Sequence, residues 1–339
     1  MSTLSDLGTP ALVVDAAALE HNLETMARAL PGARCRPHVK AHKTTALARR
    51  QREHGHRGFT CATAREVVGM AEAGLGDDLL LANELVDEDR LKALAALDAR
   101  VTVAVDSPRT VTAAADAGLT ECLIDVNVGL PRCGCAPDDA GPLAELAASR
   151  GLSVRGVMGY EGHVVGLTDR DERVRQTAEC MALLRQAHDA VGGDLISAGG
   201  TGTFDVNTVA NEIQAGSYAL MDTAYGALDL PFRRAVAVAA TVVSTNPAGG
   251  YAVADCGLKA LGMDHGNPSI DGATVWFCSD EHVTFSINDD GGGARLPAVG
   301  DRVSVWPAHV DPTVAYHERM HITDGEAVVD TWDVDLRGW

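Results

Sequence analysis

The chain has 339 residues, of which 46% are hydrophobic and 22% charged, and its formal net charge is −19. This length exceeds that of one small domain and suits a barrel with an appended domain. The excess of acidic residues excludes the basic face that nucleic acid or an anionic membrane requires, so neither is expected as a partner.

The first ten residues lack a basic segment followed by an apolar run, so no secretory signal is expected. No apolar run reaches about 18 residues, which is the length of a membrane span. The eight cysteines are scattered, and none forms a Cys-x-x-Cys pair. We therefore expect reduced thiols in a cytoplasmic protein.

In chain order, the pattern first predicts a strand at Thr9–Asp15 and a helix at Ala16–Leu30. Short apolar runs then alternate with helical patterns. The expected strands are Arg36–Lys40, Gly58–Ala62, Asp78–Ala82, Val101–Asp106, Glu121–Asn127, Val154–Tyr160, Leu195–Ala198 and Ser217–Asp222. The expected helices are Ala41–His54, Ala64–Ala73, Asp87–Leu97, Pro108–Ala117, Pro137–Ser149, Arg170–Val191 and Val206–Glu212.

Strands that are apolar along their whole length and alternate with helices indicate a parallel sheet. Eight such units predict an α/β fold, a (β/α)₈ TIM-type barrel over residues 25–235. Active-site groups should then follow the carboxyl ends of the strands. The polar residues expected there are Lys40, Thr63, Asn83, Asp106, Asn127, Arg132, Tyr160, His163, Thr201, Thr203, Asp222 and Tyr225. Thr63 and Asn83 could instead cap the next helix.

After about residue 235 the pattern changes to β-branched or alternating runs separated by turn residues. The expected strands are Val236–Thr245, Gly250–Asp255, Ala273–Cys278, His282–Ile287, Asp301–Pro307 and Glu326–Asp335. They predict a C-terminal antiparallel β-domain formed by residues 1–24 plus 236–339, which the strand at Thr9–Asp15 could join. Gly291, Gly292 and Gly293 indicate an exposed loop tip.

Pro37-His38-Val39-Lys40 ends the first predicted barrel strand. Alternation along a strand would give His38 and Lys40 the same face. A lysine held there can lose solvent, and burial favours the neutral amine that forms a Schiff base. That step opens pyridoxal phosphate chemistry. Lys43 lies beyond the strand end and is the weaker candidate, and a solvated basic strand end is the alternative.

The segment Ser197–Thr203 contains Gly199, Gly200, Thr201, Gly202 and Thr203 after the seventh strand. Glycines let backbone N–H groups turn toward an anion, and the threonine hydroxyls add donors. A phosphate near the ends of strands seven and eight is a recurring arrangement in barrels. An ordinary tight turn uses the same residue types.

Two further segments carry polar candidates. Tyr160 can stack or form a hydrogen bond after strand six. Histidine as a residue type ordinarily titrates near neutrality, so His163 could act as a base. Arg132 follows strand five and could hold a cofactor oxygen or a substrate carboxylate. A polar loop and a surface arginine are the respective alternatives.

His309 and Asp311 form a His-x-Asp pair, which on a strand would direct an imidazole and a carboxylate to one face. Nitrogen and oxygen ligands suit Mn²⁺ or Zn²⁺. Two protein ligands bind weakly, so dependence on added metal is expected. An ordinary hydrogen-bonded pair is the alternative, and His317 or His321 could add a ligand.

Taken in order, these motifs resemble the D-threonine aldolases, which are grouped with D-serine dehydratases among the alanine-racemase-like, fold type III enzymes of pyridoxal phosphate. The motifs are Pro-His-x-Lys-x-His-Lys, the Tyr160–His163 segment, Gly-Gly-Thr-Gly-Thr, Tyr218 with Asp222, Asp255-x-Gly257-x-Lys259 and His-x-Asp-Pro-Thr. The resemblance extends from Thr9 to about Thr323. It implies the same barrel and β-domain, and a homodimer with active sites at its interface.

The resemblance also implies residue roles. Lys40 would hold pyridoxal 5′-phosphate as a Schiff base, with the phosphate near Gly200, Thr201, Gly202 and Thr203. The remaining cofactor-binding candidates are His38, Arg132, Tyr160, Tyr218 and Asp222. The catalytic candidates are Lys40, Tyr160 and His163.

His309 and Asp311 would bind the divalent metal, with Mn²⁺ expected and Zn²⁺ or Mg²⁺ as alternatives. Related dehydratases typically carry cysteine at the position of Asp311. The expected reaction is cleavage of D-threonine, or a related β-hydroxy-D-amino acid, to glycine and an aldehyde. Four alternatives stay open: a 3-hydroxy-D-aspartate aldolase, a D-serine or 3-hydroxyaspartate dehydratase, a non-catalytic cofactor-binding protein and a racemase.

Overall fold

The computed structural model describes residues 2–288 and 295–339, so the loop tip expected at Gly291–Gly293 lies outside the described residues. The chain divides into two compact units. The first, here called the β unit, comprises Met1–Asn22, Ala219–Ala227 and Pro231–Asp335. The second, the barrel unit, comprises Leu23–Tyr218, Leu228–Leu230 and Leu336–Trp339.

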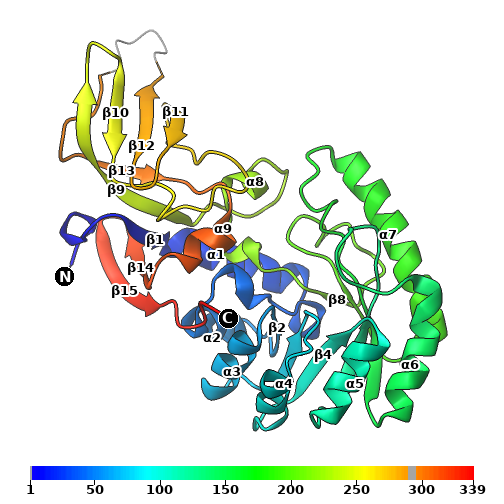
Figure 1. Cartoon of the computed structure of the whole chain (residues 1–339). Helices are drawn as coiled ribbons and strands as arrows, with labels where there is room; N and C mark the ends of the chain where they lie inside the picture. Colours follow the sequence, from blue (N-terminus) through cyan, green and yellow to red (C-terminus); the bar gives the residue numbers. More distant parts are fainter. Residues whose placement is uncertain (1, 289–294) are drawn as a thin grey trace. The chain divides into compact units, whose positions relative to one another are not determined.

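The barrel unit is built on parallel strands that pair in chain order, as predicted. Within the described residues, the strands of this sheet are β2 (Gly58–Cys61), β3 (Asp78–Leu81), β4 (Val101–Val105), β5 (Glu121–Asp125), β6 (Ser153–Met158), β7 (Leu195–Ala198) and β8 (Glu212–Ile213). The helix α2 (Thr45–Glu53) precedes β2. The helices between the strands are α3 (Ala64–Glu72), α4 (Glu88–Ala95), α5 (Pro108–Asp116), α6 (Ala140–Ser149) and α7 (Arg170–Val191) (Figure 1).

The first barrel strand, predicted at Arg36–Lys40, is wrong as a continuous strand. Cys35 bridges Ile213 and His38 bridges Thr60, both in parallel, so this segment still lies between β8 and β2. Pro37 stands between the two bridged residues and has no N–H to donate. The chain then turns into the short 3₁₀ helix η3 (Val39–Ala41). Two isolated bridges therefore take the place of a continuous strand at the first position of the barrel.

The predicted helix at Val206–Glu212 and the strand at Ser217–Asp222 are also wrong. The Asn207 side-chain oxygen accepts hydrogen bonds from the amides of Val209 and Ala210, a local turn that competes with helix. The eighth strand is instead the two-residue β8. Tyr218 lies instead in the short 3₁₀ helix η5 (Ser217–Ala219), and the left-handed backbone of Met221, with φ of 55°, is incompatible with a strand.

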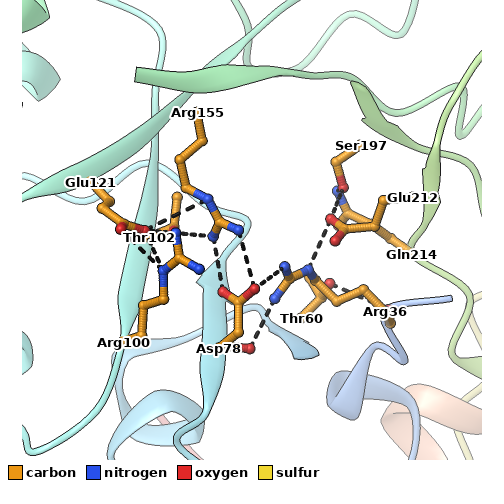
Figure 2. A network of polar contacts seen from close by, with 10 residues as sticks. All are labelled: Arg36, Thr60, Asp78, Arg100, Thr102, Glu121, Arg155, Ser197, Glu212 and Gln214. Carbon is orange, nitrogen blue, oxygen red and sulfur yellow. Dashed lines mark hydrogen bonds and ion pairs between the residues drawn. The ribbon is translucent and has the colours of Figure 1, made fainter. Parts of the chain in front are cut away.

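A network of charged side chains fills the region where the barrel strands begin (Figure 2). Arg36, 3% exposed, contacts Asp78 on β3 at 2.8 Å and Glu212 on β8 at 2.8 Å. Arg155 on β6 reaches Asp78 at 2.9 Å and Glu121 on β5 at 3.6 Å. Because Arg36 joins β3 to β8, it links strands on both sides of the weakly paired first position.

The β unit contains a mixed sheet, whereas an antiparallel one was predicted. Among the residues that the structure describes, its strands are β1 (Ala11–Asp15), β9 (Val236–Asn246), β10 (Tyr251–Ala254), β11 (Ala273–Cys278), β12 (Val283–Ile287), β13 (Arg302–Val305), β14 (Arg319–Asp324) and β15 (Ala327–Asp333). The N-terminal strand β1 joins the sheet as expected, antiparallel to β9. Its other neighbour, β14, runs parallel to it and was not predicted.

The short helices of the β unit are η1 (Leu4–Asp6), α8 (Thr223–Gly226) and α9 (Val310–Ala315). The helix α1 (Ala16–Ala29) follows β1 and continues into the barrel unit, close to its predicted range. The remaining short 3₁₀ helices, η2 (Gly32–Arg34), η4 (Pro137–Asp139) and η5 (Ser217–Ala219), lie in the barrel unit or at its end. In the described ranges, no helix is both long and apolar enough to cross a membrane.

Candidate active site

Lys40 lies in the turn η3, directly after the segment that closes the barrel sheet. His38 is the N-cap of this turn, and its Nδ1 accepts a hydrogen bond from the Lys40 amide at 3.4 Å. Burial, with smaller contributions from Lys40, Lys43 and His42, lowers the pKa of His38 well below its ordinary value. His38 is therefore a neutral group beside the lysine.

Strand alternation does not apply to Lys40, because the chain has already left the extended conformation at Val39. Lys43 has a left-handed backbone with φ of 50°, and its ammonium group donates to the carbonyl oxygen of Lys40. The helix predicted to begin at Ala41 therefore begins at Thr45. Thr44 is its N-cap, and the Thr44 side chain accepts a hydrogen bond from the Ala46 amide.

Tyr160 brings two of the predicted cationic residues together. The Lys40 Nζ lies 5.6 Å from the centroid of its ring, and the Arg132 Cζ lies 5.5 Å from it. Both distances fall within the range of cation–π contacts. Residues from the loops after three different barrel strand positions therefore meet at one aromatic ring.

The Gly199–Thr203 loop follows β7, as predicted, and part of it requires glycine. A Cβ on Gly202 would lie 1.8 Å from the carbonyl oxygen of Val165, so a side chain cannot be accommodated without movement of the backbone. Thr201 Oγ1 accepts a hydrogen bond from the Tyr218 amide at 2.9 Å. The loop is therefore tightly packed, and backbone groups lie where side chains would otherwise be.

Glu161 lies against this loop and was not singled out from the sequence. The side chain is fully buried, and its carboxylate accepts hydrogen bonds from the Thr203 hydroxyl at 2.8 Å and the Gly199 amide at 3.2 Å. Burial raises the pKa of Glu161, against the opposing effect of these hydrogen bonds. The Thr203 hydroxyl also accepts from the Gly200 amide, so it serves the internal structure of the loop.

Tyr218 and Asp222 hold backbone in place. Tyr218 is fully buried, and its hydroxyl accepts a hydrogen bond from Gln51 at 3.0 Å within the barrel unit. In the β unit, Asp222 caps α8 by accepting from the Tyr225 amide, and its second oxygen accepts from the Val310 amide at 3.0 Å. Burial raises the pKa of Asp222.

His163 is exposed in the loop after β6, and its Nε2 lies 3.7 Å from Cys180 Sγ on α7. Thr63 caps α3 by accepting from the Glu66 amide, which is the structural alternative considered for it. Asn83 donates to the carbonyl oxygen of Ala62. Thr63 and Asn83 therefore form hydrogen bonds with nearby backbone groups.

The β unit contains the second group of candidates. His309 is the N-cap of α9, and Asp311 lies in its first turn, so the expected strand location of this pair is wrong. The pair is nevertheless close, with His309 Nε2 3.7 Å from Asp311 Oδ2. His309 Nδ1 lies 2.6 Å from Asp264 Oδ2, and the His265 ring stacks on His309 at 3.9 Å.

Asp264, His265 and His309 form a cluster whose potential metal-ligating atoms all lie within 4.8 Å of one another. The other two histidines considered have different partners. His317 Nε2 bonds to the Ala260 carbonyl oxygen at 2.9 Å, and His321 Nδ1 contacts Thr331 Oγ1 at 3.0 Å.

Comparison with known proteins identifies the family. Residues 14–223 match the family described as alanine racemase, N-terminal domain, and residues 235–323 match a putative serine dehydratase domain. A D-threonine aldolase of an Arthrobacter species is 34% identical over an alignment that covers 99% of this chain and 94% of that protein. The chain belongs to the D-threonine aldolase family. The predicted resemblance is therefore confirmed, and membership implies pyridoxal phosphate as the cofactor.

Two further proteins resemble the chain along nearly its whole length. The 3-hydroxy-D-aspartate aldolase of Paracoccus denitrificans (strain Pd 1222) is 31% identical, with 98% of this chain and 93% of that protein covered. The crystal structure of D-threonine aldolase from Filomicrobium marinum has a TM-score of 0.92 and 34% identity, and 99% of this chain and 97% of that chain are covered. The alanine-racemase-like fold predicted from the sequence is confirmed.

Proposed function

We propose that the chain cleaves D-threonine and related β-hydroxy-D-amino acids to glycine and an aldehyde, using pyridoxal 5′-phosphate and a divalent metal ion. The observation that carries the proposal is the pairing of His309 Nε2 with the carboxylate of Asp311 at 3.7 Å. Because related dehydratases typically have cysteine at this position, the carboxylate favours an aldolase. The similarity to a D-threonine aldolase over 99% of the chain supports the same reading.

The residues of the barrel unit fit the cofactor. Lys40 is only partly exposed and lies at an aromatic face, an environment suited to a Schiff-base lysine. The Gly199–Thr203 loop is rich in glycine, and at Gly202 any Cβ would meet the backbone of Val165, so the path of the loop depends on the missing side chain. Glycine-rich turns of this kind can direct backbone N–H groups toward an anion. When bound, pyridoxal phosphate supplies an electron sink for the carbanion left by bond cleavage.

We assign the following roles within the barrel unit. Lys40 holds the cofactor, and neutral His38 adds no second positive charge beside it. Tyr160 covers the lysine, and Arg132 holds a carboxylate or a cofactor oxygen. Gly200, Thr201, Gly202 and Thr203 form the phosphate loop, and Tyr218 supports it by donating its amide hydrogen to Thr201.

His309 and Asp311 are the proposed metal ligands, and Asp222 supports them through the Val310 amide between them. A nitrogen and an oxygen donor suit Mn²⁺, which we propose as the native ion, with Zn²⁺ and Mg²⁺ as alternatives. A bound ion supplies Lewis-acid activation of the substrate β-hydroxyl. We assign acceptance of the hydroxyl proton to His163.

The test is turnover by the protein loaded with pyridoxal phosphate and Mn²⁺, Zn²⁺ or Mg²⁺, with products identified. The substrates are D-threonine, D-phenylserine, D-serine and 3-hydroxy-D-aspartate. We expect glycine and the matching aldehyde from the first two, and loss of turnover with a chelator. Pyruvate and ammonia from D-serine, with no glycine from D-threonine, would overturn the proposal in favour of a dehydratase.

A second candidate is 3-hydroxy-D-aspartate aldolase activity, supported by the relative of that name at 31% identity. It shares the cleavage step and differs in the aldehyde, which would be glyoxylate. A ratio of kcat/KM that favours 3-hydroxy-D-aspartate over D-threonine by tenfold or more would establish it.

Three finer predictions belong to the same proposal. The enzyme is a homodimer, which size-exclusion chromatography with light scattering would test. It is cytoplasmic, which cell fractionation would test. Its domains are residues 25–235 and residues 1–24 plus 236–339, which limited proteolysis would test.

A further inference from the structure

The two ring nitrogens of His309 face two different carboxylates. Nδ1 lies 2.6 Å from Asp264 Oδ2, and Nε2 lies 3.7 Å from Asp311 Oδ2. All of these groups belong to the β unit. The proposed function uses His309 and Asp311, whereas Asp264 has no role in it.

These two distances distinguish a hydrogen bond from a shared metal ion. Ligand atoms about 2.0–2.2 Å from one ion are usually about 3 Å or more apart. The separation between His309 Nε2 and Asp311 Oδ2 meets that condition. The separation between Nδ1 and Asp264 Oδ2 is too short for it and is typical of a charge-assisted hydrogen bond.

The backbone fixes Asp264 beside His309. Gly262 forms an antiparallel bridge with His309, and its amide donates to Thr313 Oγ1 at 2.9 Å. The same Thr313 hydroxyl donates to the carbonyl oxygen of His309 at 2.7 Å. A Cβ on Gly262 would lie 2.2 Å from Pro312 Cγ, so this close approach requires glycine. The backbone contacts between the Gly262 segment and the start of α9 therefore hold Asp264 beside His309.

His265 occupies one face of the His309 ring. The two rings are parallel to within 4°, with centroids 3.9 Å apart. This stacking opposes rotation of His309 out of the plane that its hydrogen bond defines. Asp264 and His265 thus act on the orientation of the same imidazole.

We propose that Asp264 is a positioning residue for the metal site, an inference that rests on the proposed function. Its carboxylate accepts a hydrogen bond from His309 Nδ1, which keeps Nε2 directed toward Asp311. A carboxylate behind a ligating histidine fixes the ring and makes the other nitrogen a better donor. Asp264 acts through His309 and does not itself coordinate the ion.

The experiment measures Mn²⁺ affinity by electron paramagnetic resonance of free Mn²⁺, on the cofactor-loaded protein without substrate. The variants are Asp264→Ala and Asp264→Asn, and the matched control is Asp324→Asn, an exposed aspartate at the end of β14. We expect about tenfold weaker binding for Asp264→Ala and about threefold for Asp264→Asn, whose amide oxygen still accepts the proton. The control should bind as the wild type does, and the metal-free Tm values should agree.

His265→Ala and Asp311→Ala separate positioning from direct ligation. Positioning predicts a large loss of affinity for Asp311→Ala and a small one for His265→Ala. If Asp264 and His265 were ligands, His265→Ala would weaken binding as much as Asp264→Ala, and Asp311→Ala would have little effect. That pattern overturns the inference, as does wild-type affinity in Asp264→Ala or a wild type that binds no Mn²⁺.

The outcome is separable from that of the proposed function. Metal-dependent cleavage of D-threonine with unchanged Mn²⁺ affinity in Asp264→Ala would reject only the positioning role. The expected pattern of affinities in a protein that does not cleave D-threonine would reject only the substrate assignment.

Discussion

The two ends of the barrel strands use charge in opposite ways. Where the strands begin, Arg36 and Arg155 are paired with carboxylates on neighbouring strands, Asp78 above all (Figure 2). Where they end, Lys40 and Arg132 each lie near the face of Tyr160, which attracts a cation without neutralising it.

This difference indicates which charged residues contribute to stability and which to ligand binding. Charges that neutralise one another are suited to stability, because their partners are supplied by the fold itself. Cations at an aromatic face keep their charge for a ligand, and barrel enzymes carry their chemistry at that end. Variants at the two ends should therefore separate activity from stability.

The largest effect is expected for Lys40→Ala. Because this lysine is the proposed attachment point of the cofactor, turnover should fall by roughly four orders of magnitude while Tm stays unchanged. Steady-state kinetics and the Schiff-base absorbance of the cofactor are the measurements. The control is Lys92→Ala on α4, because Lys92 forms an exposed ion pair with Glu88 and has no role in the proposed function. If Lys40→Ala retained the Schiff-base absorbance of the cofactor, Lys40 would not be the attachment point.

The opposite result is expected for Asp78→Asn. This change leaves Arg155 and the buried Arg36 short of one partner, so the free energy of unfolding should fall by about 3 kcal/mol. Activity per folded molecule should be unchanged. Urea unfolding is the measurement, and Glu88→Gln, a surface-pair control, should cost under about 0.5 kcal/mol. A loss of kcat with unaltered stability would contradict the separation of the two ends.

The same network should make the fold sensitive to acid. Burial raises the pKa of Asp78, but hydrogen bonds from Arg155 and Arg36 outweigh it and hold the pKa at about 2. An unfolded aspartate titrates near ~3.9. Since the folded pKa is depressed, the stability from ionised Asp78 is complete above the unfolded value and is lost as pH falls toward about 2. The difference between wild type and Asp78→Asn should shrink over that window in urea titrations.

Glu161 is a buried carboxylate at the end of the barrel where the strands end, and its partners are uncharged hydrogen-bond donors. It tests whether a carboxylate at this end contributes to cofactor binding. In Glu161→Gln an N–H₂ group replaces one of the two acceptor oxygens, so either the Thr203 hydroxyl or the Gly199 amide loses the acceptor to which it donates. Misfit in the loop should weaken pyridoxal phosphate binding roughly tenfold. Titration of the cofactor-free protein measures it, with exposed Glu145→Gln on α6 as control. Equal affinities would mean that the loop does not depend on this carboxylate.

Local signals explain which elements the sequence predicted. The predicted bounds of the helix α7, Arg170–Val191, match the structure, in which Asp169 caps its start and Gly192, with a positive φ, follows its end. The strand β8 has two residues, too few for any periodicity, and was missed. The alternation of strands and helices therefore predicted the barrel fold, but it did not predict the short segments that close the sheet.

The site follows the same rule. Motif residues such as Lys40 and His309 were found because their chemistry is carried by neighbours in sequence. Glu161 and Asp264 were missed because their partners are distant, with Thr203 42 positions from Glu161 and His309 45 positions from Asp264. Only packing in three dimensions brings such pairs together, and no local pattern records it.

The smallest effect is expected at Tyr160, where the ring contacts both cations of the functional end. Tyr160→Phe and Tyr160→Leu both lack the hydroxyl, so comparing them isolates the aromatic face. A cation–π contact at a partly exposed site contributes about 0.5–1 kcal/mol, so the leucine variant should bind pyridoxal phosphate about two- to fivefold more weakly than the phenylalanine variant. Equal affinities would mean that the ring only fills space. The positive charges of Lys40 and Arg132 would then need partners other than the aromatic face, and the contrast with the paired arginines at the other end would disappear.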